Sequence, residues 1–132
     1  MPLVRFTLRK GSSPDFLASV GSAVQAALVA QAKIPADDHF QVFDEVDRDH
    51  LVVDRCFAGL PPSKPVERSE GVIVIEITLN EGRSDEVKSA LYADIAARLG
   101  ELGVRPDDVF INLVEVKKQN WSMAGGLMTY PA

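Results

Sequence analysis

The chain has 132 residues, of which 46% are hydrophobic and 25% charged, and this size and composition suit one globular domain with its own apolar core. The net charge is −5 and the basic residues form no cluster, which argues against nucleic acid as the main partner. The opening residues lack the pattern of a signal peptide and no apolar run could span a membrane, so we expect a cytoplasmic protein. Cys56 is the only cysteine and neither His39 nor His50 has a second ligand at metal-binding spacing, so we expect no disulfide and no metal.

The chain opens with Met1 and Pro2. If Met1 is removed, the nitrogen of Pro2 becomes a secondary amine at the end of the chain. A terminal amine titrates at roughly 7.7–8.0, and an apolar pocket lowers its pKa by disfavouring the charged form. Such a base suits proton abstraction next to a carbonyl group. The alternative is that Met-Pro is only a common and easily processed start.

The first half of the chain is predicted to form a strand, a helix and a strand. Residues 3–8 alternate between apolar and polar side chains, as a half-buried strand does. Ser13 suits the N-cap of the following helix, Pro14 suits its first position, and Ile34-Pro35 ends it. Residues 40–46 form the second strand. The helix is expected to bury one stripe of side chains, all apolar but the last: Phe16, Leu17, Val20, Val24, Ala27, Leu28 and Gln31.

The middle of the chain is predicted to be mostly irregular. Residues 47–50 have the composition of a hairpin turn that leads into a strand at 51–53. Residues 59–70 are interrupted by three prolines and are interpreted as an irregular connection.

The second half repeats the order of the first. Residues 72–79 are rich in β-branched side chains and are predicted to form a central strand, and residues 109–116 form the last long strand. Ser84 caps the helix between them and Gly103 ends it. The turn-rich tail at 120–126 is able to fold as a hairpin onto a neighbouring chain. The buried stripe of the second helix is expected to be Val87, Leu91, Ile95, Leu99 and Leu102.

The two halves also match residue by residue. We interpret the chain as one domain, 1–132, with a first half and hairpin at 1–58, a connection at 59–71, and a second half and tail at 72–132. Two β-α-β units with right-handed crossovers predict an α+β fold, a four-stranded mixed sheet with both helices on one face. The other face then needs a second subunit as cover. Matching positions include Gly11 with Gly82, Ser13 with Ser84, and Asp37-Asp38 with Asp107-Asp108.

These features together resemble the tautomerase superfamily, and within it the malonate semialdehyde decarboxylase-like members. The resemblance rests on Pro2, on the repeated β-α-β unit, and on three local matches that lie in register over nearly the whole chain. The matches are Pro-Ala-Asp-Asp-His-Phe-Gln at 35–41, Gly-Arg-Ser-Asp-Glu at 82–86, and Pro-Asp-Asp-Val at 106–109 leading to Asn-Trp-Ser at 120–122.

The resemblance implies a homotrimer with an active site near each Pro2 and without metal or organic cofactor. It also implies keto–enol tautomerisation, or the decarboxylation of a 3-oxo acid with hydration as a side activity. Asp38 is in register with the aspartate of the decarboxylase, and Arg83 with the second arginine of its Arg-Pro-Arg run. Glu81 stands in place of the first arginine, and a carboxylate there would repel an acidic substrate.

Each candidate site residue has a structural alternative. Arg83 either binds a substrate carboxylate or a developing enolate, or it is a solvated arginine of a turn. Asp38 either holds or activates water, or it only bonds the backbone of a turn, as its repeat partner Asp108 suggests. Trp121 either forms a pocket wall or a subunit contact, or it is ordinary packing.

We therefore expect a tautomerase-superfamily enzyme that uses Pro2 as general base and acid on a small 2-oxo or 3-oxo acid. Arg83 and Asp38 are expected to be further catalytic residues, and Trp121 is expected to lie in the substrate pocket. One alternative is a malonate semialdehyde-type decarboxylase or hydratase. An alternative of another class is a non-catalytic βαββαβ module that binds a ligand or partner.

Overall fold

The computed structural model describes residues 1–57 and 65–130. Its main elements are β1 (Leu3–Arg9), α1 (Pro14–Ala32), β2 (Gln41–Val46), β5 (Ile73–Asn80), α2 (Asp85–Glu101) and β6 (Val109–Val116). Shorter elements join them: the 3₁₀ turns η1 (Arg48–His50), η2 (Pro106–Asp108) and η3 (Lys118–Asn120), and the two-residue strands β3 (Cys56–Phe57) and β4 (Val66–Glu67).

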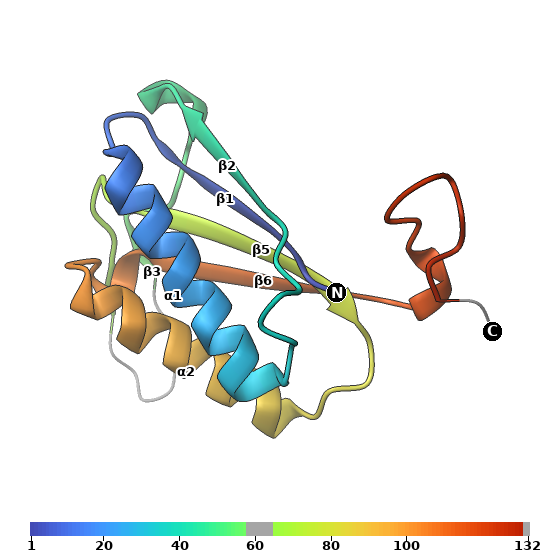
Figure 1. Cartoon of the computed structure of the whole chain (residues 1–132). Helices are drawn as coiled ribbons and strands as arrows, with labels where there is room; N and C mark the ends of the chain where they lie inside the picture. Colours follow the sequence, from blue (N-terminus) through green and yellow to red (C-terminus); the bar gives the residue numbers. More distant parts are fainter. Residues whose placement is uncertain (58–64, 131–132) are drawn as a thin grey trace.

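The long strands form one four-stranded mixed sheet in the order β2-β1-β5-β6. The two strands of each half run parallel, and β1 and β5 join the halves as an antiparallel pair. Figure 1 shows α1 and α2 side by side on the same face of this sheet. The predicted α+β fold, with tandem β-α-β units and both helices on one face, is confirmed. None of the helices in the described ranges is long and apolar enough to cross a bilayer.

The core lies between the sheet and the two helices. Alternate residues of β1 and β5 point toward the helices and are almost completely buried, and Phe6 stacks on Phe43 of β2 with ring centroids 4.5 Å apart. Each fully buried aliphatic side chain contributes about 1.5–3 kcal/mol to folding. The fully buried side chains with the largest volumes are Phe6, Leu28, Ile73, Ile75, Ile77, Leu79, Leu91, Ile95 and Leu99.

The two halves have the same local geometry. Gly11 and Gly82 both adopt positive φ, at +119° and +118°, at the turn between strand and helix. Ser13 and Ser84 then cap α1 and α2, because each hydroxyl accepts the backbone N–H three residues further along. The turns η1 and η3 follow β2 and β6 at matching positions.

The helix ends differ slightly from the prediction. Helix α1 ends at Ala32 rather than at Ile34-Pro35, because Lys33 adopts a left-handed conformation with φ of 59°. Leu102, expected in the buried stripe of α2, lies just beyond the helix and is 37% exposed. The stripe therefore ends at Leu99.

The predicted strand at 51–53 is wrong. Residues 48–50 form η1 rather than a hairpin turn, with Asp47 as the N-cap, and Val52 is 90% exposed. The guanidinium of Arg9 takes the place of a strand partner, because it donates to the carbonyl oxygens of Arg48, Leu51 and Glu70. The pairing in this region is β3 with β4. Of the predicted connection 59–70, residues 59–64 lie outside the described residues, and the remainder contains β4.

Candidate active site

Pro2 lies at the end of the sheet where β1 begins and β5 ends, because these two strands are antiparallel and Leu3 pairs with Thr78. It is buried and lines a cavity of about 190 Å³. The walls are mostly apolar and come from the start of β1, the residue before β2, and the tail after η3. The lining residues are Met1, Pro2, Leu3, Phe40, Trp121, Ser122 and Met123. Two predicted site residues, Pro2 and Trp121, thus share one cavity.

Asp38 faces the N-terminus of the chain. Its Oδ2 lies 3.3 Å from the amine of Met1, in a position that is 24% exposed. Asp38 belongs to a turn closed by its own N–H, which donates to the carbonyl of Pro35 at 3.0 Å. The buried Gln25 of α1 fixes this turn, because its Nε2 donates to the carbonyls of Ala36 and Asp38 at 3.5 and 3.2 Å. The carboxylate of Asp38 is therefore held beside the residues that precede β1.

Asp108, the repeat partner of Asp38, lies in the same kind of turn, but its side chain has different contacts. Its N–H donates to the carbonyl of Arg105 at 2.9 Å, as that of Asp38 does to Pro35. Its side chain is almost fully buried, and its carboxylate accepts the N–H and the hydroxyl of Ser69. The turn motif is thus shared by both halves, whereas only Asp38 points its carboxylate at a chain terminus.

Trp121 is fixed by the end of β5. Its Nε1 donates to Oδ1 of Asn80 at 2.7 Å, and its carbonyl accepts the N–H of Thr129 at 3.0 Å. The indole ring therefore stands as a rigid wall of the cavity, with its one donor already used.

Arg83 lies at the same end of the sheet but does not line the cavity. Its guanidinium donates twice to the carbonyl of Ala32, at 3.3 and 3.0 Å, and once to the carbonyl of Asn80, at 3.1 Å. It therefore satisfies a free carbonyl at the end of α1. Asn80 links Arg83 to Trp121, and so Arg83 reaches the cavity only through another residue. Glu81 is exposed beside this turn.

The sequence reasoning missed Gln25, Asn80 and Tyr130. The phenol oxygen of Tyr130, near the C-terminal end of the chain, lies 3.4 Å from the amine of Met1. Asn80 had a signal, since a polar residue at the end of a buried strand often faces a site. Tyr130 had none, because its contact spans the whole chain.

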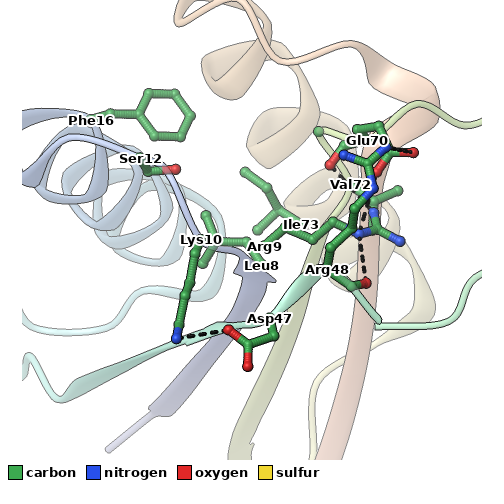
Figure 2. A pocket seen from close by; sticks show the side chains of 11 residues that line it. Leu8, Arg9, Lys10, Ser12, Phe16, Asp47, Arg48, Glu70, Val72 and Ile73 are labelled. Atoms are coloured by element: carbon green, nitrogen blue, oxygen red, sulfur yellow. Dashed lines mark hydrogen bonds and ion pairs between the residues drawn. The ribbon is translucent and has the colours of Figure 1, made fainter. Parts of the chain in front are cut away.

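A larger cavity of about 560 Å³ lies at the opposite end of β1 (Figure 2). Its charged side chains are paired with one another: Lys10 with Asp47 at 2.8 Å, and both Arg9 and Arg48 with Glu70, at 3.5 and 3.0 Å. This cluster fastens the segments around η1 and β4, and leaves no cation directed at a ligand. Across residues 1–57 and 65–130, no three His, Cys, Asp or Glu side chains are grouped as metal ligands.

Comparisons with known proteins identify the family to which the chain belongs. Two family models, both described as tautomerase enzyme, match residues 38–124 and residues 2–57. The chain belongs to the tautomerase family. It is 35% identical over 127 residues to the probable tautomerase YusQ of Bacillus subtilis, covering 96% of this chain and 95% of that one.

Solved tautomerase-fold structures agree with this assignment. The malonate semialdehyde decarboxylase FG41, solved with 3-bromopropiolate as inhibitor, is 30% identical, with a TM-score of 0.86 over 97% of this chain and 93% of that one. A fused 4-OT trimer shares the fold, with a TM-score of 0.74 over 96% of this chain and 94% of that one, at 21% identity. The predicted resemblance to the superfamily and to its malonate semialdehyde decarboxylase-like members is therefore confirmed.

Proposed function

We propose that the chain, after removal of Met1, is a cofactor-independent tautomerase that uses Pro2 as general base and acid on a small 2-oxo or 3-oxo acid. The observation that carries this proposal is the buried position of Pro2 in the lining of a small, mostly apolar cavity, with the Asp38 carboxylate 3.3 Å from the amine of Met1. The loss of Met1 places a secondary amine in this cavity and also opens the space that Met1 fills.

The proposed reaction moves one proton. The lone pair of the Pro2 nitrogen takes a proton from the carbon next to the substrate carbonyl, and the electron pair of that C–H bond forms the double bond of the enolate. The protonated Pro2 then returns the proton at the other reacting atom, so that the enzyme is unchanged. Apolar walls such as Leu3 and Phe40 favour the neutral amine, because they disfavour its charged form.

Charged residues at this end of the sheet have proposed roles in binding. We assign Arg83 to the substrate carboxylate, either from the same chain or from a neighbouring copy in a homotrimer. We assign Asp38 to the orientation of the Pro2 ammonium or of a water molecule, since its carboxylate lies 3.3 Å from the amine of Met1, the residue before Pro2. Trp121 shapes the pocket.

A decarboxylase is the second candidate. It is favoured by the 30% identity to the malonate semialdehyde decarboxylase FG41 and by the position of Asp38. Glu81 argues against malonate semialdehyde as the substrate, because a carboxylate stands where an arginine is expected. Release of carbon dioxide from malonate semialdehyde faster than any tautomerisation would favour this candidate.

The test uses protein whose free Pro2 terminus has been verified by intact-mass spectrometry. Ketonisation of phenylenolpyruvate and of other 2-oxo acids is measured beside carbon dioxide release from malonate semialdehyde. Pro2→Ala is expected to reduce turnover by roughly 10²–10⁴-fold, the usual contribution of a positioned general base. Pro14→Ala, the same change at the exposed start of α1, is expected to keep wild-type activity. Wild-type turnover by Pro2→Ala on every substrate would show that Pro2 is not the base, and a non-catalytic binding module would then be favoured.

A further inference from the structure

The amine of Met1 marks the space that a substrate would enter if the function proposed above is correct. This amine is part-buried and has two polar neighbours in the described chain, Asp38 Oδ2 at 3.3 Å and the Tyr130 hydroxyl at 3.4 Å. Since Met1 directly precedes Pro2, both groups lie close to the Pro2 nitrogen in the chain. Removal of Met1 vacates the position of its amine, which adjoins Pro2 in the chain and contacts Asp38 and Tyr130.

We propose that Tyr130 is a catalytic residue of the Pro2 site, and that its hydroxyl donates a hydrogen bond to the carbonyl oxygen of the substrate. When Pro2 removes the neighbouring proton, the C–H electron pair forms the carbon–carbon double bond and negative charge develops on this oxygen. A donor placed at that oxygen stabilises the charge more in the transition state than in the bound substrate. Tyr130 keeps its own proton throughout.

Asp38, Trp121 and Arg83 are less suited to this task. The ionised carboxylate of Asp38 only accepts hydrogen bonds. The Nε1 of Trp121 already donates to Asn80, and the guanidinium of Arg83 donates to backbone carbonyls. The Tyr130 hydroxyl accepts from the Met1 amine, so its proton remains available to an oxygen that takes the place of Met1.

The tail holds Tyr130 in place. The N–H of Thr129 donates to the carbonyl of Trp121 at 3.0 Å, and the N–H of Met123 donates to the Thr129 hydroxyl at 2.9 Å. These bonds close the tail into a loop, which Figure 1 shows folding back beyond the end of β6. One loop therefore presents both Trp121 and Tyr130 to the start of β1.

The experiment compares Tyr130→Phe with Tyr92→Phe in protein with a free Pro2. Tyr92 is the other tyrosine of the chain and lies on α2, 36% exposed, so it receives the same chemical change away from the site. Tyr130→Phe is expected to lower kcat by roughly 10²–10³-fold, as the loss of one oxyanion donor does. Its KM, its Tm and the emission of Trp121, the sole tryptophan, are expected to stay at wild-type values. Tyr92→Phe is expected to match the wild type throughout.

Two results would overturn this inference alone. One is equal kcat in Tyr130→Phe and Tyr92→Phe while Pro2→Ala is inactive. The other is a loss that comes with altered Trp121 emission and a raised KM, which would give Tyr130 only a packing role. Undiminished activity in Pro2→Ala would overturn the proposed function and this inference with it, so that the two failures are distinguishable.

Discussion

At the scale of single residues, Asp38 and Asp108 have different roles although they are the same residue type in matching turns. They occupy matching turns in the two halves, yet Asp108 is buried and bonded to Ser69, whereas Asp38 faces the amine of Met1. A buried carboxylate that loses an oxygen leaves an N–H without its partner, and this costs free energy. A partly exposed carboxylate at a terminus costs little to replace. The two positions should therefore separate stability from activity.

Asp108→Asn is expected to lower the free energy of unfolding by about 1–3 kcal/mol. Asp38→Asn is expected to change it by less than about 0.5 kcal/mol while lowering turnover. Denaturant unfolding and the ketonisation assay, run on both variants, measure the difference. Each variant serves as the control for the other, and equal losses of stability in both would contradict the assignment.

At the scale of elements, a polar link connects the two helices. Gln31 of α1 donates to Asp94 Oδ2 at 3.1 Å, and Arg98 donates to Asp94 Oδ1 at 2.8 Å. Burial raises the pKa of Asp94, but the hydrogen bonds from Gln31 and Arg98 outweigh it and leave this pKa below its ordinary value of 3.8. Because the pKa is lowered in the folded state, the charged carboxylate stabilises the fold at pH values above 3.8. This contribution is lost as the pH falls through the lowered pKa.

Gln31→Leu is expected to lower the free energy of unfolding at pH 7 by about 0.5–1.5 kcal/mol, because it removes one hydrogen bond to the Asp94 carboxylate. The difference from wild type should shrink as the pH falls below 3.8. Urea unfolding at pH 7 and pH 3 measures it. A difference of the same size at both pH values would show that the loss comes from packing rather than from the charged carboxylate.

Much of this element order could be predicted from local sequence, because caps and alternation act over a few residues. Ser13 and Ser84 mark both helix starts, and the last long strand has the predicted bounds 109–116. The strand at 51–53 could not be rejected locally, since its composition suits a strand, whereas the carbonyl of Leu51 is bound by the distant Arg9.

The site was predicted in part for the same reason. Pro2, Asp38 and Trp121 stand out by residue type and position, and the structure brings them to one end of the sheet. The contacts of Arg83 with Ala32 and of Tyr130 with Met1 join segments far apart in sequence. No local pattern encodes such contacts, because they depend on how β5 and the tail pack against β1.

At the scale of the whole molecule, one face of the sheet has no helix over it in the described chain (Figure 1). We call this the open face; it carries Arg5, Glu76, Val114 and the other side chains that alternate with the core. Arg5 lies opposite Glu76 in the pairing of β1 with β5, and the 51–54 segment covers only the end near Val74. A half-apolar sheet face of this kind is usually buried against another copy.

We therefore expect a homotrimer in solution, with three times the mass of one chain by sedimentation. Val114→Arg, which places a charge on the open face, is expected to shift the mass toward that of a single chain. Ala90→Arg, the same residue introduced at an exposed position of α2, should leave the assembly intact. A wild-type chain that sediments as a monomer at all concentrations would contradict the expectation.

The proposed catalysis depends most on the peptide bond between Met1 and Pro2, because the Pro2 nitrogen is a base only when that bond is cut. The most direct measurement is the ketonisation rate of phenylenolpyruvate by two preparations of the same chain. One has a free Pro2 terminus, and the other retains Met1 after expression with an inhibitor of methionine aminopeptidase. Intact-mass spectrometry gives the processed fraction of each. If Pro2 is the base, the ketonisation rate is proportional to the fraction of chains with free Pro2. An equal rate in both preparations would contradict the role of Pro2.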